Sequence, residues 1–188
     1  WISAITTVLL AILFAYLFVM DWDHNPSSLT TDGNTLFVKN KNGKVIWDKS
    51  IRTIQTKFID QNYLNCLARI IDINSDGMNE VLITNQIIKE ELGKDPDDSL
   101  RCYSSEGNLI WGYAINDEVY SRREKLSSDY SIRIIDTLTF NGRKSLFLYS
   151  SNGPSFSSAV HRIDLKTGTR LPGIFWTSGH IADGIIRD

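Results

Sequence analysis

Residues 36–47 read LFVKNKNGKVIW and residues 100–111 read LRCYSSEGNLIW, so one pattern occurs twice in the chain. The same spacing of 64 residues links further landmarks: Gly43 with Gly107, Trp47 with Trp111, Ile51 with Ile115, and residues 69–72 with residues 133–136. A third, looser copy begins at residues 162–168, RIDLKTG. One frame shared by separate landmarks indicates an internal structural repeat.

Each repeat unit is predicted to hold two β-hairpins. In the first unit, apolar residues favour four strands, near 34–40, 44–50, 67–72 and 80–86. Gly43 and Gly77 stand in the two turns, where glycine supplies the positive φ angle that such turns require. Four antiparallel strands make one propeller blade, and a blade needs neighbours to bury both of its faces.

The fold expected from this repeat is all-β, a partial β-propeller of about two and a half four-stranded blades. The repeat region covers residues 34–188, with units at about 34–97 and 98–158 and an incomplete one at 159–188. Trp47 and Trp111 occupy equivalent strand ends, and we expect both to pack between blades as core residues.

The loop at residues 72–80, DINSDGMNE, carries the most specific chemical signal. Calcium takes six to eight oxygen ligands, and a tight loop supplies them from alternate residues. The predicted calcium ligands are the side chains of Asp72, Asn74 and Asp76, the backbone carbonyl of Met78, and Glu80, with Gly77 allowing the sharp turn. The alternative is a hairpin turn rich in Asp and Asn that holds no metal. A bound calcium would stiffen the loop rather than catalyse a reaction.

The corresponding loop of the second unit, at residues 136–145, is predicted to be an ordinary turn. It keeps the leading Asp136 but places Leu138 and Phe140 where oxygen ligands are needed. Arg143 and Lys144 add positive charge that repels a cation. One structural calcium site is therefore expected in this chain.

The repeat unit resembles the FG-GAP and VCBS class of propeller repeats, found in integrin-like and many bacterial surface proteins. The loop at 72–80, between a short apolar strand and residues 81–83, carries this resemblance. The Gly-x-x-x-Trp hairpins, and residues 164–168, also resemble quinoprotein-type blades. The resemblance covers most of residues 34–188 and implies a ring of four to eight blades, of which this chain holds a part.

Residues 1–20 form an apolar run without a charge, Pro or Gly. As a helix the run would measure roughly 30 Å, which matches the hydrocarbon core of a bilayer. A signal peptide would have a shorter apolar region and a small-residue cleavage site, and a buried core helix would show a polar face. We therefore predict a single transmembrane helix, with the lipid bilayer as a partner.

The flank of this run predicts the orientation of the chain. Asp21 and Asp23 follow the run, and the first Lys or Arg is Lys39, whereas cytoplasmic flanks carry Lys or Arg. The C-terminal region is thus expected in the periplasm or the extracellular space, after a polar linker at residues 21–33. Because the chain opens inside an apolar run and closes on a strand-like IIRD, we expect it to be a fragment of a longer protein.

The composition excludes some partners and sites. The net charge is −2, so there is no basic excess that would favour nucleic acid. Cys66 and Cys102 fit no zinc or redox motif, and two separately buried thiols are favoured over a single disulfide. The three histidines are scattered and are expected to be ordinary surface or turn residues.

Two classes of function remain. The first is a membrane-anchored binding or sensory module, displaying a calcium-stabilised propeller surface to a protein or glycan ligand outside the cytoplasm. The second is a quinoprotein-like oxidoreductase that holds a quinone in a central funnel. No catalytic or cofactor-binding residue is assigned, because no catalytic motif is present in the sequence. The binding module is therefore the favoured prediction.

Overall fold

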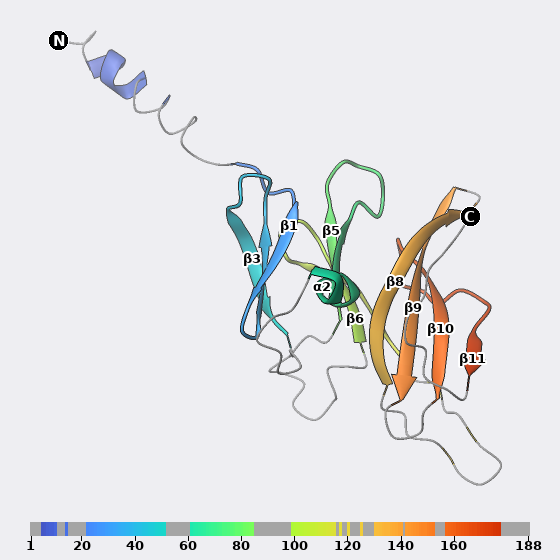
Figure 1. Ribbon diagram of the computed structural model, residues 1–188. Helices are drawn as coiled ribbons and strands as arrows, with labels where there is room; N and C mark the ends of the chain where they lie inside the picture. The colour runs from blue at the N-terminus through green and yellow to red at the C-terminus, as the bar shows by residue number, and fades with distance from the viewer. Residues whose placement is uncertain are drawn as a thin grey trace.

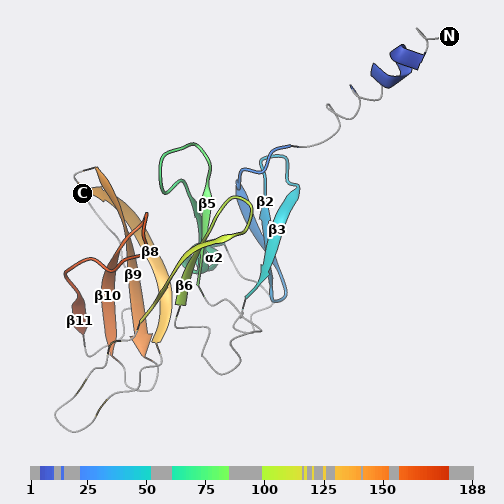
Figure 2. The same cartoon turned by 180° about the vertical axis from the view of Figure 1, so that it is seen from behind.

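The protein is built mainly of antiparallel β-strands (Figures 1 and 2). The computed structural model describes residues 5–10, 14, 22–51, 61–84, 99–115, 117, 120, 125, 130–140, 142–152 and 157–177. Within these ranges the strands form three sheets, which Figure 1 shows side by side.

The first sheet has three strands in the order β1-β2-β3, namely β1 (Ser28–Asp32), β2 (Thr35–Lys39) and β3 (Val45–Ser50). Strand β1 lies inside the segment predicted to be a linker, so the polar residues 21–33 are not all linker. The strand forms because Leu29 packs against the core and every residue of β1 pairs with β2, from Ser28 opposite Lys39 to Asp32 opposite Thr35.

The second and third sheets have four strands each. The second has the order β4-β5-β6-β7, with β4 (Ala68–Ile71), β5 (Glu80–Thr84), β6 (Ser99–Tyr103) and β7 (Leu109–Ala114). The third has the order β11-β10-β9-β8, with β8 (Tyr130–Phe140), β9 (Arg143–Asn152), β10 (Ser158–Asp164) and β11 (Phe175–Thr177). All neighbours in these two sheets are antiparallel.

The sheets divide the chain differently from the predicted units 34–97 and 98–158. The second hairpin of the first unit, β4-β5, shares a sheet with the first hairpin of the second unit, β6-β7. Strand β5 is the reason, because it is buried along its whole length and needs a partner on each edge. It finds β4 on one side and β6 on the other.

The repeat itself is visible in the backbone. Trp47 lies opposite Val38, Trp111 lies opposite Cys102, and each pair is followed by the same irregularity in register. Gly43 and Gly107 both adopt positive φ, at 78° and 83°, as the sequence predicts for these turns. The equivalence of residues 36–47 and 100–111 is therefore confirmed at the level of strand register.

A short helix, α2 (Gln61–Leu67), interrupts the β-structure. This helix was not predicted from the sequence. Leu64 and Leu67 are buried, Leu64 belongs to the same apolar cluster as Leu36 of the first sheet and Val81 of the second, and α2 also contacts β4 and β8. Its seven residues make about two turns.

The core is divided into two apolar clusters, one at each interface between sheets. The cluster between the first and second sheets includes Leu36, Val38, Val81 and Ile83. The cluster between the second and third sheets is larger and includes Leu82, Leu100, Cys102, Ile132, Ile134, Leu146, Leu148 and Ile163. Adjacent residues of β5 thus face opposite clusters, which follows from the two-residue period of a strand.

The repeated tryptophans pack between sheets, as predicted. A Cβ atom added at Gly107 would lie 3.0 Å from the Trp47 ring, and one added at Gly168 would lie 2.5 Å from the Trp111 ring. Each tryptophan therefore lies against the turn glycine of the next sheet. The Trp47 Nε1 also donates a hydrogen bond of 2.8 Å to the Ser105 carbonyl.

The N-terminal prediction falls mostly outside the described residues. Residues 5–10 are helical, whereas 1–4, 11–13 and 15–21 lie outside the described part of the chain. Among the residues that the structure describes, no helix is both long enough and apolar enough to span a membrane. The transmembrane helix at 1–20 stays a prediction. The predicted strand at the C-terminal end also lies outside the described ranges.

Candidate functional site

The predicted calcium loop connects β4 to β5, two neighbouring strands of the second sheet. The Asp72 carboxylate accepts backbone hydrogen bonds from Ser75 (2.5 Å), Asn74 (3.3 Å) and Gly77 (3.0 Å). Ser75 and Gly77 both have positive φ, at 65° and 88°. The loop thus wraps around the side chain of its first residue, because the carboxylate satisfies backbone donors that no strand satisfies.

Asn74 and Asp76 bond to each other on the exposed side of the loop. The Asn74 Nδ2 donates to Asp76 Oδ2 at 2.8 Å, and the Asp76 backbone N–H donates to Asn74 Oδ1 at 3.0 Å. The Met78 backbone N–H donates to Asp76 Oδ1 at 2.7 Å. These exposed side chains face solvent, so water or a cation can reach their oxygen atoms.

Glu80 is the last residue of the loop and the first residue of β5. Its side chain is only 6% exposed, and one carboxylate oxygen accepts a hydrogen bond of 2.9 Å from the Ile73 backbone N–H. Burial raises the pKa of Glu80, and the nearby charges of Asp76 and Asp72 raise it further. The loop therefore holds three carboxyl groups that repel one another electrostatically.

The pKa of Asp72 is shifted in the opposite direction from that of Glu80. Desolvation acts to raise the pKa of Asp72, but the backbone hydrogen bonds from Gly77, Ser75 and Asn74, together with Lys144, outweigh it and the pKa is lowered. The charged form of Asp72 is consequently favoured, whereas Glu80 is more easily protonated than Asp72.

Lys144 contacts the first loop, whereas the sequence predicted an effect on the second loop. Its Nζ donates a 2.6 Å hydrogen bond to the Asp72 backbone carbonyl, so a cation of the third sheet contacts the first loop. Arg143 pairs instead with Asp164, at 3.3 Å. The positive charges at 143–144 thus act on other segments and not only on the loop that contains them.

Asp136, aligned with Asp72 in sequence, lies within β8 rather than at the start of a loop. The β8–β9 pairing continues as far as Phe140 opposite Arg143. The Asp136 carboxylate forms an ion pair of 2.7 Å with Arg69 of β4, across the interface between two sheets. Asp136 therefore contributes to sheet packing.

The donor chemistry of the first loop fits a hard cation, because the predicted ligands are all oxygen atoms. In the present arrangement these oxygens are engaged with N–H groups of the loop itself. No three His, Cys, Asp or Glu side chains of the described residues converge as they would around a metal ion. Calcium binding by Asp72, Asn74, Asp76, Met78 and Glu80 stays a prediction, and it would require Asn74 and Asp76 to exchange their mutual hydrogen bond for the ion.

His161 is fully buried, so the expectation of a surface or turn residue is wrong for this histidine. Its Nε2 lies 2.9 Å from the Ser150 Oγ and its Nδ1 lies 3.3 Å from the Tyr113 hydroxyl. Burial lowers the pKa of His161 to about 4. Ser150 is also fully buried, so this Ser–His pair is a core element that solvent does not reach. Ala159, His161 and Ile163 alternate along β10 and share its buried face, and this alternation is the sequence signal that could have predicted the burial of His161.

The His161 network continues to the molecular surface. Arg170 hydrogen-bonds to the Tyr113 hydroxyl and forms an ion pair with Asp117. Burial raises the pKa of Tyr113, which stays protonated as a hydrogen-bonding phenol. This chain of groups joins β7, β9 and β10, and it carries polar contacts through an otherwise apolar interface.

Both cysteines are free thiols. Cys102 is fully buried, whereas Cys66 is partly exposed, so the expectation of buried thiols holds for Cys102. Burial raises the pKa of Cys102 to about 12, and Glu80 adds to the effect. A thiol with this pKa is unreactive at neutral pH.

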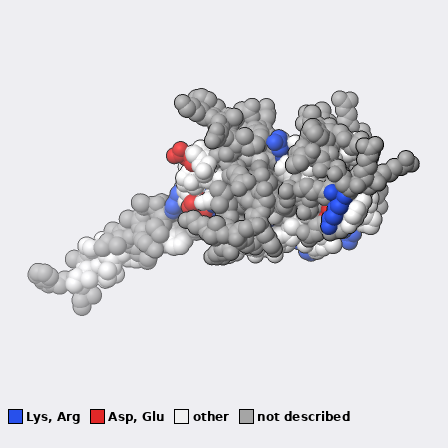
Figure 3. All heavy atoms as spheres, turned by 90° about the horizontal axis from the view of Figure 1, so that it is seen from below, with Lys and Arg blue, Asp and Glu red and all other residues white. Residues whose placement is uncertain are grey.

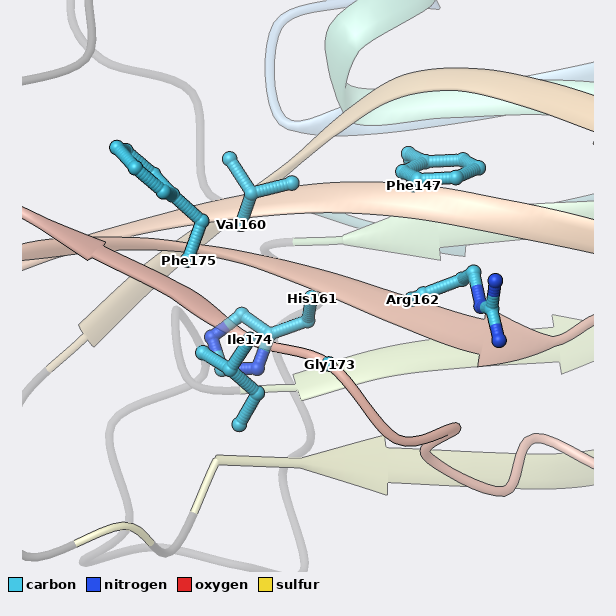
Figure 4. A pocket seen from close by; sticks show the side chains of 7 residues that line it. All are labelled: Phe147, Val160, His161, Arg162, Gly173, Ile174 and Phe175. Atoms are coloured by element: carbon cyan, nitrogen blue, oxygen red, sulfur yellow. The ribbon is translucent and has the colours of Figure 1, made fainter.

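The outer face of the third sheet carries a hollow of about 330 Å³ (Figure 4). Phe147, Val160 and Phe175 project from one side of the sheet, whereas His161 is directed to the other side. Phe175 is 65% exposed. On the face drawn in Figure 3, the described charged side chains are scattered and form no patch of one sign.

No protein-family model, no curated protein and no solved structure matches this chain.

Proposed function

We propose that this chain is a membrane-anchored, extracytoplasmic binding or sensory module, whose sheets are blades of a β-propeller stabilised by one calcium ion. The loop at 72–80 is the observation that carries the proposal. Its oxygen-bearing side chains Asn74 and Asp76 are exposed, while Asp72 and Glu80 are fixed by backbone hydrogen bonds. Exposed oxygen atoms beside two fixed carboxylates are what such a loop needs to bind an ion.

The electrostatics of the loop favour a cation. Asp72 and Asp76 both raise the pKa of Glu80, so their negative charges both act on the Glu80 carboxyl group. A divalent cation would compensate this repulsion, and it would replace the Asn74–Asp76 hydrogen bond with stronger ionic contacts. Its effect would be structural, because it would hold the β4–β5 connection in one conformation.

The repeated contacts between sheets support the propeller arrangement. The same tryptophan-to-glycine contact joins the first sheet to the second and the second to the third. Arg69 and Asp136 add an ion pair across the second interface. Sheets that meet through a repeated contact are related by a similar step, which is how blades follow one another in a propeller.

The apolar segment supports membrane anchoring. Five large apolar side chains of its described part are 57–62% exposed, namely Ile5, Val8, Leu9, Leu10 and Phe14. Such side chains on one short stretch are unfavourable in water and favourable in a bilayer. The hollow beside Phe175, with Arg162 at its edge, is a surface on which a protein or glycan ligand would find aromatic and guanidinium groups.

The calcium site is tested by calorimetry on the full chain in detergent micelles. We expect one calcium ion to bind, with a dissociation constant of about 10⁻⁴ to 10⁻³ M, the range of extracellular modules. Asp76→Ala should abolish binding, because it removes a predicted ligand. Asp136→Ala is the matched control and should bind calcium as the wild type does, since Asp136 pairs with Arg69. Unchanged affinity in Asp76→Ala would show that the site assignment is wrong.

A further inference from the structure

The loop at 72–80 is held by a segment that lies about fifty residues earlier in the chain. The Asn25 Nδ2 donates a 3.0 Å hydrogen bond to the Gly77 carbonyl, and the Asn25 Oδ1 accepts a 2.8 Å hydrogen bond from the Asn79 backbone N–H. The Asn79 Nδ2 in turn donates to the Pro26 carbonyl at 2.8 Å. Asn25 and Asn79 thus join the two segments through three hydrogen bonds.

The same segment is fixed on its other side by the first sheet. The Asp23 carbonyl accepts a 2.9 Å hydrogen bond from the Asn40 Nδ2, and Asn40 is only 1% exposed. The Asp23 carboxylate accepts from the Asn25 backbone N–H at 3.1 Å and lies 3.8 Å from the Lys41 Nζ. Residues 23–26 therefore run between the β2–β3 turn and the loop at 72–80.

We propose that residues 23–26 and the loop at 72–80 form a clasp, through which a cation bound in the loop fixes the segment that follows the N-terminal apolar run. This inference rests on the proposed calcium site and concerns its regulation. It assigns to Asn25 and Asn79 the role of positioning residues, since neither is a predicted ligand.

The coupling follows from shared backbone. Gly77 lies between the predicted ligands Asp76 and Met78, and its N–H is bound by the Asp72 carboxylate while its carbonyl is bound by Asn25. A cation that draws Asp72, Asp76 and the Met78 carbonyl together would restrict the peptide units that Asn25 contacts. Cation binding would therefore already order these peptide units. Forming the clasp would then cost less additional conformational entropy.

The clasp is tested by hydrogen–deuterium exchange on the full chain in detergent micelles, with and without Ca²⁺ at about 5 mM, above the expected dissociation constant. In the wild type, calcium should slow exchange of the amides at 23–27 by about fivefold or more, because local opening of the segment is suppressed. Asn25→Ala should still bind calcium in calorimetry but should lose this slowing. Asn42→Ala, an exposed asparagine of the neighbouring turn, should behave as the wild type.

The outcomes separate the clasp from the calcium site. Calcium binding in calorimetry without slower exchange at 23–27 would overturn the clasp and leave the proposed function intact. Slowing that persists in Asn25→Ala would also overturn it, because the coupling would then bypass Asn25. Absence of calcium binding to the wild type would refute the proposed calcium site, and the clasp would fail with it.

Discussion

His161 illustrates how strongly a single residue depends on partners from other strands. The imidazole lies between the Ser150 hydroxyl and the Tyr113 hydroxyl, with the Trp176 ring 6.1 Å away and the Asp117–Arg170 pair beyond Tyr113. Burial disfavours its charged form, and Arg170 opposes protonation while Asp117 favours it. The neutral ring is therefore a component of the core over most of the pH range.

This burial predicts a pH dependence of stability. Because the pKa of His161 is about 4 in the folded protein and about 6.5 when unfolded, the unfolded state binds more protons between these values. The stabilisation is complete above about pH 6.5 and is lost as the pH falls toward 4, by about 3 kcal/mol in the free energy of unfolding.

Urea denaturation at several pH values measures this effect. His161→Gln keeps hydrogen-bonding groups but does not titrate, so its free energy of unfolding should fall less than that of the wild type between neutral pH and pH 4. Glu80 and the other carboxyl groups titrate in both proteins, and comparing the two curves removes their contribution. Parallel curves would show that His161 is not the titrating group.

At the scale of elements, the hairpin turns decide how one sheet meets the next. Gly43, Gly107 and Gly168 all have positive φ, but only the last two lie against a tryptophan ring. A Cβ at Gly43 would meet no atom within 4 Å. The positive φ angle therefore favours glycine at all three turns. At Gly107 and Gly168 the contact with a tryptophan ring also leaves little room for a larger side chain.

Alanine substitutions separate these two requirements. Gly43→Ala should destabilise the protein by about 1–2 kcal/mol, the cost of left-handed backbone for a residue with a Cβ. Gly168→Ala should cost about 1–3 kcal/mol more, because its Cβ would lie 2.5 Å from the Trp111 ring and force the ring to move. Chemical denaturation of both variants gives the difference. Equal losses of stability would mean that the contact between Trp111 and Gly168 is not tightly packed.

At the scale of the whole molecule, three sheets are joined by two apolar interfaces, and the N-terminal segment is fastened across the first of them. The outermost sheets differ in character. The outer side of the first sheet carries Ser28, Thr30 and Asp32, which are all exposed, whereas the third sheet presents the exposed Phe175 and its hollow. The exposed face of β1 is therefore polar, whereas the third sheet exposes an aromatic side chain beside its hollow.

Membrane anchoring is predicted for the whole chain. After carbonate extraction of membranes that contain the expressed protein, the chain should remain in the pellet, because residues 1–20 bury apolar side chains in the bilayer. A variant with Leu9→Lys and Leu10→Lys should be released, since each charge near the middle of a span costs about 2.5–3.5 kcal/mol. Release of the unaltered chain would argue for a cleaved signal segment instead.

Short-range features of this protein were predictable from the sequence. The strands at 35–39, 45–50 and 68–71 and the start of β5 lie where alternation and turn residues indicate, and Gly43, Gly77 and Gly107 have the positive φ expected of them. The repeat and the packing of its two tryptophans were also readable. These features depend on a few neighbouring residues or on a comparison of the chain with itself, so no knowledge of the fold is needed.

Other features depend on which distant segments meet, and only the tertiary structure decided them. Burial on both faces made β5 pair with β6, which shifted the sheets relative to the predicted units. His161 became a core residue through Tyr113 and Ser150, and the loop at 72–80 acquired Lys144 and Asn25 as contacts. The sequence places these partners tens of residues apart, and a side chain's environment is set by the sheets that close around it. Local pattern therefore determined the strands and turns, while packing between sheets determined their partners.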